Sequence, residues 1–158
     1  MADLQALVED LGYRDVRTVL NSGNVVFTVP GKATGSAGAR IERAIEKRLG
    51  ISSRVTVLTA VELANLVAGN PLGAVVNNPS RLLVTVFAKP ADRARLDSLA
   101  RTDWAPEALA IGERVAYIWC PDGILKSRVM EGVSRLLGDA ATSRNWATMT
   151  KLHALMQG

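Results

Sequence analysis

The sequence predicts an α+β fold of two ferredoxin-like repeats, each a split βαβ unit, with antiparallel-rich sheets, helices on one face and an additional C-terminal helix. The element order predicts this fold. Residues 2–58 read helix, strand, strand, helix, strand, and residues 82–137 read strand, helix, strand, strand, helix. We therefore expect a first repeat over residues 1–68, a linker over residues 69–81 and a second repeat over residues 82–158.

The composition is that of a globular protein that folds without disulfides or bound metal. The chain has 158 residues, of which 48% are apolar, enough to bury a core, and no apolar run reaches the roughly 20 residues of a membrane helix. Its single cysteine, Cys120, has no partner for an internal disulfide, and its single histidine, His153, leaves no His/Cys cluster for zinc. We expect a cytoplasmic protein with no membrane partner, no metal and no cofactor.

The first repeat begins with a helix and a hairpin. Apolar residues recur at helical spacing over residues 2–11, and Gly12 provides a helix end. Two short β-branched segments, residues 16–20 and 24–29, flank a turn and predict an antiparallel hairpin. Residues 30–38 are rich in Gly, Ala and Ser and predict a mobile loop.

A second helix and a third strand complete this repeat. Ile41, Ile45 and Leu49 share one face of a helix that ends at Gly50, and residues 54–58 predict a strand.

A capping box begins the next helix. Thr59 and Glu62 have the spacing at which each side chain accepts from the backbone N–H of the other residue, which predicts a helix over residues 60–68. The linker that follows is rich in Asn, Pro and Gly, which interrupt helices and strands.

The second repeat begins with an apolar strand that has no counterpart in the first. Its predicted elements are a strand over residues 82–87, a helix over 91–100, strands over 108–111 and 115–120, and helices over 125–137 and 145–155. In a split βαβ arrangement the initial strand lies inside the sheet, so its absence from the first repeat leaves backbone groups without partners. One explanation is that another chain fills that position, as in a homodimer formed through the incomplete first repeat.

Three segments resemble a known family. They are Asn21-Ser22-Gly23-Asn24-Val25-Val26-Phe27, Tyr117-Ile118-Trp119-Cys120-Pro121-Asp122-Gly123-Ile124 with Lys126-Ser127, and Thr142-Ser143-Arg144-Asn145-Trp146 with Thr148, Thr150, Lys151 and Leu152. In this order they resemble the bacterial family DUF1697, a domain of unknown function. The resemblance implies an α+β fold of two ferredoxin-like repeats and supplies no established reaction.

Members of that family begin with a strand and a Gly-rich turn ahead of the helix at residues 2–11, and this sequence lacks that segment. Two explanations are open. Either the start lies downstream of the true one, or the chain is a shortened member whose first strand comes from another chain.

The turn Asn21-Ser22-Gly23-Asn24 is the first candidate site. Its backbone amides are suited to an anion and Ser22 is a possible nucleophile, since Gly allows close approach of a ligand to the backbone. No catalytic motif surrounds Ser22. The alternative is an ordinary hairpin turn in which Asn and Gly supply left-handed conformations.

The segment Pro121-Asp122-Gly123, followed by Lys126, is the second candidate site. It precedes a predicted helix, whose N-terminal amides and dipole favour a phosphate. Asp122 supports the alternative that its own carboxylate caps the helix.

Arg144, Asn145 and Lys151 form the third candidate, because a planar cation, an amide and an ammonium group suit phosphate or base contacts. Asn145 is also the expected N-cap of the last helix. Trp146, Met149 and Leu152 share one face of that helix, which we assign to the core.

We expect Cys120 to be a buried inert thiol and His153 to be partly buried without a metal.

These observations favour a binding module for an anionic small molecule or nucleic acid, in keeping with a net charge of +4 and a pI of about 9.6. Its expected ligand-binding residues are Asn21, Ser22, Gly23, Asn24, Lys126, Arg144, Asn145 and Lys151. One alternative is an enzyme of unknown reaction, with Ser22, Asp122, Lys126 and Asn145 in a cleft that an N-terminal segment completes. Another is an interaction or assembly protein.

Overall fold

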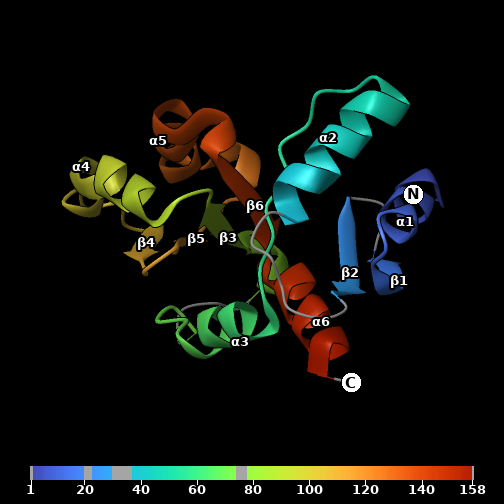
Figure 1. The fold of residues 1–158 in the computed structure, drawn as a ribbon. Helices are drawn as coiled ribbons and strands as arrows, with labels where there is room; N and C mark the ends of the chain where they lie inside the picture. The colour runs from blue at the N-terminus through green and yellow to red at the C-terminus, as the bar shows by residue number, and fades with distance from the viewer. Residues whose placement is uncertain (1, 20–22, 30–36, 74–77, 158) are drawn as a thin grey trace. The chain divides into compact units, whose positions relative to one another are not determined.

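The computed structural model describes residues 2–19, 23–29, 37–73 and 78–157 and is of mixed α and β structure, with six α-helices and two antiparallel sheets in these residues (Figure 1). The chain divides into two compact units, Met1–Val57 and Leu58–Gln157. The expected division into residues 1–68, 69–81 and 82–158 stays a prediction. None of the helices in the described ranges is long and apolar enough to cross a membrane.

The first unit contains the predicted helix and hairpin. Its elements are α1 (Ala2–Asp10), β1 (Arg14–Val19), β2 (Asn24–Thr28) and α2 (Ala37–Leu49). Gly12 ends α1 with a φ of 95°, and β1 pairs antiparallel with β2. The apolar faces of both helices and the hairpin form one core, with Leu7, Val8, Val16 and Ile41 buried.

Two expectations for this unit are wrong, and one lies outside the described residues. Leu49 is 41% exposed, because it lies in the last turn of α2, whereas Ile41 and Ile45 are buried as expected. Residues 54–58 do not form a strand, and the Val55 amide donates to Glu42 Oε1 at 2.7 Å. Of the expected loop, residues 30–36 are not described, and the rest begins α2.

The second unit is built around a four-stranded sheet with the order β4-β5-β3-β6, in which all neighbours are antiparallel. Its elements are α3 (Ala60–Ala68), β3 (Leu82–Phe87), α4 (Asp97–Ala100), β4 (Ala108–Ile111), β5 (Val115–Trp119), α5 (Arg128–Leu137), β6 (Ala141–Asn145) and α6 (Trp146–Gln157). Short 3-10 turns lie at Pro79–Arg81, Pro90–Leu96, Ile124–Lys126 and Gly138–Ala140. The capping box of Thr59 and Glu62 forms at the start of α3 as predicted.

Three features of this unit differ from the sequence prediction. The strand β6 was not predicted. The expected helix over residues 91–100 is a 3-10 turn followed by the single turn α4, and the helix expected from residue 125 begins only at Arg128.

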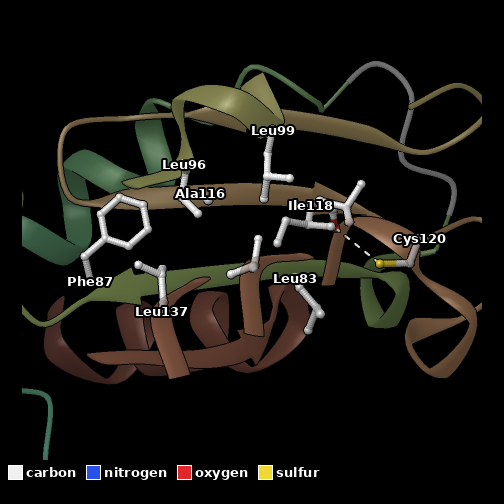
Figure 2. Packing of buried hydrophobic residues seen from close by; sticks show 10 residues of the cluster. Leu83, Phe87, Leu96, Leu99, Ala116, Ile118, Cys120 and Leu137 are labelled. Atoms are coloured by element: carbon white, nitrogen blue, oxygen red, sulfur yellow. Dashed lines mark hydrogen bonds between the residues drawn. The ribbon is translucent and has the colours of Figure 1, made fainter. Parts of the chain in front are cut away.

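Helices cover both faces of this sheet, not one as expected. Figure 1 shows α4 and α5 on one side of the strands and α3 and α6 on the other. Because side chains alternate along each strand, Phe87 and Ile118 pack on the α4 and α5 side, as Figure 2 shows, whereas Val84 and Tyr117 pack with α3 and α6. The arrangement of two ferredoxin-like repeats stays a prediction.

Candidate functional site

The strand register brings three segments to one end of the four-stranded sheet. Leu82, the first residue of β3, lies opposite Trp119, the last residue of β5, and Leu83 lies opposite Asn145, the last residue of β6. The turn before β3, the loop over residues 120–127 and the start of α6 therefore meet at this end. A direct contact joins two of them, because Arg81 Nη1 donates to the carbonyl oxygen of Pro121.

The start of α6 is capped by a neutral side chain. Asn145 Oδ1 accepts from the Thr148 N–H at 2.9 Å, which confirms Asn145 as the N-cap. Met149 is 3% exposed, and Trp146 and Leu152 pack against the same core, so this face of α6 is structural as predicted. These contacts leave the N-terminal end of the helix dipole without a carboxylate in the cap.

The two predicted basic ligands near this helix differ in how the protein holds them. Arg144 lies opposite Val84, so its side chain is on the face covered by α3 and α6, where it is half-buried and Nη1 donates to the Ser143 carbonyl oxygen at 2.8 Å. Lys151 is exposed on α6. Lys126 is likewise exposed, in the 3-10 turn of the neighbouring loop.

The start of α5 is occupied by an internal carboxylate. Ser127, not Asp122, is the N-cap, and its Oγ accepts from the Met130 N–H at 3.1 Å. Glu107, 20 residues earlier, accepts from Ser127 Oγ at 2.6 Å, from the Arg128 N–H at 2.9 Å and from the Val129 N–H at 3.3 Å. The position that the sequence suggested for a phosphate therefore holds the protein's own anion, and the capping role assigned to Asp122 is wrong.

The electrostatics of Glu107 agree with this role. Burial by itself favours the protonated form, but the hydrogen bonds from Ser127, Arg128 and Val129 and the charge of Arg128 outweigh burial and lower the pKa of Glu107. Its side chain is 8% exposed, and Arg128 Nε lies 3.5 Å from Oε1.

Cys120 and His153 have no visible reactive role. Cys120 is buried, its thiol lies 3.9 Å from the Ile118 carbonyl oxygen (Figure 2), and burial raises its pKa, which agrees with an inert thiol. His153 is half-buried, with a buried Nε2 that has no hydrogen-bond partner in the described part of the chain. No three His, Cys, Asp or Glu side chains within the described residues could together hold a metal ion.

The predicted turn site belongs to the first unit, and the other candidates belong to the second. Asn21 and Ser22 lie outside the described residues. Gly23 has a φ of 78°, and Asn24 is buried with Nδ2 donating to the Val19 carbonyl oxygen at 3.3 Å, which agrees with a hairpin turn. A binding role for this turn stays a prediction.

Arg81 and Glu107 are the residues at this end of the sheet that sequence reasoning missed. Their contacts are long-range, 40 residues for Arg81 with Pro121 and 20 for Glu107 with Ser127, so no local motif records them. The sequence feature that could have identified Arg81 is its position directly before the apolar strand β3, which is central in the sheet.

The comparisons with known proteins agree with this fold. The conserved bacterial protein SP0830 from Streptococcus pneumoniae has a structure similar to this chain, with a TM-score of 0.80 over 100% of this chain and 89% of that one. At 16% identity this likeness shows the fold alone. No curated protein matches the sequence. The model of a protein family of unknown function, DUF1697, matches residues 1–117, so the chain belongs to the DUF1697 family.

Proposed function

We propose that the protein is a binding module for an anionic small molecule or nucleic acid. In this proposal the acidic group of the ligand binds at the end of the sheet where the turn before β3, the loop over residues 120–127 and the start of α6 meet, with Arg81, Lys126, Asn145 and Lys151 as its ligands. The observation that carries the proposal is the register of β3 with β5 and β6, because it brings segments far apart in sequence to one place.

The charges at this end favour an anion. Arg81, Lys126 and Lys151 are exposed, and the loop over residues 120–127 contributes one acidic residue, Asp122. The other carboxylate at this end, Glu107, is paired with Arg128. Lysines act as mobile point charges toward a phosphate or carboxylate, whereas a guanidinium offers two parallel donors. Since Arg81 already donates to the Pro121 carbonyl oxygen, it also holds the loop that presents Lys126.

The dipole of α6 adds to these charges. An α-helix carries a partial positive charge at its N-terminus, and a neutral Asn145 cap leaves that charge uncompensated. The 12-residue length of α6 is enough for a full dipole. The start of α5 does not offer the same opportunity, because Glu107 binds there.

The enzyme alternative receives less support. Of its four expected residues, Ser22 lies outside the described chain, Asp122 and Lys126 are exposed, and Asn145 serves as a helix cap. The groups with a shifted pKa have structural partners. Burial raises the pKa of Tyr117, whose hydroxyl donates to the Leu66 carbonyl oxygen at 2.6 Å.

Glu62 is structural in the same way. Burial by itself raises its pKa, but hydrogen bonds from Thr59 and Arg114 and the charge of Arg114 outweigh burial, so the pKa is lowered. Arg114 Nη1 lies 2.6 Å from Glu62 Oε2. The pair therefore links α3 to the turn between β4 and β5.

The test is a binding experiment on the full chain with inorganic phosphate, nucleotides and single-stranded oligonucleotides, read by thermal shift and calorimetry. Lys126→Gln and Lys151→Gln each weaken binding by about tenfold, the effect of losing one well-placed charge contact. The matched control is Lys89→Gln, because Lys89 is exposed and follows the opposite end of β3. An equal loss of affinity in the control, or the absence of binding by all these anions, contradicts the proposal.

Salt separates the two ligand classes. Nucleic acid binding falls steeply with salt because each phosphate contact releases counterions. A single small anion that contacts one or two cations shows a shallower slope in the same titration.

A further inference from the structure

The strand β4 is an edge of the four-stranded sheet, and its residues Ala-Leu-Ala-Ile carry no charge, proline or glycine. Natural edge strands are usually very short, as β4 is, or carry charges, prolines or bulges, because unpaired backbone groups attract other strands. The opposite edge, β6, contains Arg144 and hydroxyl side chains. The two edges of the sheet therefore differ in how well they are protected.

The alternation of hydrogen bonds along β4 identifies which backbone N–H and C=O groups point away from the sheet. The Gly112 N–H donates to the carbonyl oxygen of Val115, the first residue of β5, at 2.7 Å, so Gly112 directs its backbone groups toward β5. Because bonded residues alternate along an antiparallel strand, Ala110 and Ala108 also direct their N–H and C=O groups toward β5. Leu109 and Ile111 direct theirs away from the sheet, where the described chain supplies no hydrogen-bond partner.

The geometry points to a second copy of this chain as the partner of β4, paired antiparallel about a twofold axis at Ala110. In that register Leu109 lies opposite Ile111 of the second copy, and Ile111 opposite Leu109. Both pairs are hydrogen-bonded pairs, so all outward N–H and C=O groups of the two residues are satisfied by four bonds. The two Ala110 residues form the close, non-bonded pair on the axis, where a methyl side chain fits.

The side chains support the same pairing. Leu109 and Ile111 are half-buried against the core on the α4 and α5 side, and Ala108 and Ala110 against the core on the α3 and α6 side. Pairing two copies through β4 extends both apolar layers across the axis. Because β4 has no charge, a strand of identical sequence meets no like-charge repulsion there.

Charges lie only at the ends of this pairing. Glu107 falls opposite Glu113 of the second copy, but its carboxylate is turned into the start of α5. In the twofold arrangement, β4 of each copy supplies the hydrogen-bond partners of β4 of the other copy. Most homodimers have a self-complementary interface of this kind. A four-residue strand buries less than a standard interface, so we expect a weak dimer with a dissociation constant on the order of micromolar.

The first test is sedimentation velocity of the full chain from about 0.1 µM to about 100 µM, a range that extends below and above that constant. Ala110→Arg and Ala110→Glu each place two like charges opposite each other on the axis and raise the dissociation constant by about tenfold or more. An equal mixture of the two variants restores association as a heterodimer, because the facing charges become opposite. A wild type that stays monomeric throughout, or a mixture that associates no better than either variant alone, overturns the proposal.

The second test removes the donor alone. Ile111→Pro deletes the outward N–H and no bond to β5, whereas Ile111→Ala loses similar packing and keeps the N–H. Circular dichroism establishes that both variants are folded before association is measured. Association lost in the proline variant and kept in the alanine variant supports the β4 pairing, and equal association of the two contradicts it.

Discussion

The helices α5 and α6 begin at the same end of one sheet but complete their N-terminal turns in different ways. At α5 the free amides of Arg128 and Val129 donate to the carboxylate of Glu107, whereas at α6 the cap is the neutral amide of Asn145. Both helices have the dipole that attracts anions. The difference teaches that a helix N-terminus is available to a ligand only where the fold has not already supplied an anion of its own.

The largest expected effect comes from removing that internal anion. Glu107→Ala leaves the Ser127 hydroxyl and two backbone amides without their acceptor, in a place where Glu107 is 8% exposed. We expect a loss of about 3 kcal/mol in the free energy of unfolding, measured by urea denaturation of the full chain.

The control is Glu113→Ala, which removes the same charge from an exposed turn and changes stability by less than about 0.5 kcal/mol. A loss in Glu107→Ala no greater than in this control would mean that the carboxylate does not stabilise α5.

The pH dependence of Glu107 is the next effect. Its pKa in the folded protein is lowered below the ordinary value of 4.5, so its contribution is present at pH values above 4.5 and is lost as the pH falls through the folded pKa. Glu107→Gln removes this titration. The stability difference between wild type and Glu107→Gln is expected to be about 2 kcal/mol at neutral pH and to shrink in acid. Urea denaturation of both proteins across this range measures it, and a constant difference contradicts the assignment.

A smaller effect is expected at α6. Asn145→Ala removes one neutral cap bond, the acceptor for the Thr148 N–H, and costs about 1 kcal/mol in the same measurement. Lys151→Ala is the stability control on this helix, since Lys151 is exposed and Ala favours helix. If Asn145→Ala is no less stable than this control, the cap contributes nothing to α6.

Sequence patterns predicted the elements that are stabilised by interactions between residues a few positions apart. The capping box of Thr59 and Glu62, the α1 end at Gly12 and the cap at Asn145 depend on side chains a few residues apart, and each forms. Strand β6 was missed because its sequence, Ala-Thr-Ser-Arg-Asn, has no apolar alternation, and it forms by pairing with the apolar β3. Thr85 Oγ1 and Ser143 Oγ lie 2.8 Å apart across this pair, so the two strands are also joined through hydroxyl groups.

The candidate site was less predictable than the fold for the same reason. Asn145 and Lys126 were expected from neighbouring residues, whereas Glu107 reaches its partners across 20 residues and the pattern at Pro121-Asp122-Gly123 pointed to the wrong cap. A helix start read from sequence shows that amide donors exist. Which group accepts from them depends on the tertiary arrangement.

The variant with the smallest expected effect on stability, Asn145→Asp, tests the comparison between the starts of α5 and α6 most directly. Asn145→Asp gives α6 a carboxylate cap, so its start carries an anion as the start of α5 does. Asp caps as well as Asn and gains from the dipole, so stability is unchanged or rises by about 0.5 kcal/mol. Affinity for phosphate or an oligonucleotide, measured by calorimetry, is expected to fall about tenfold, because the new charge repels the ligand. Unchanged affinity in a stable Asn145→Asp variant would place the anion away from α6 and remove the distinction between the two helix starts.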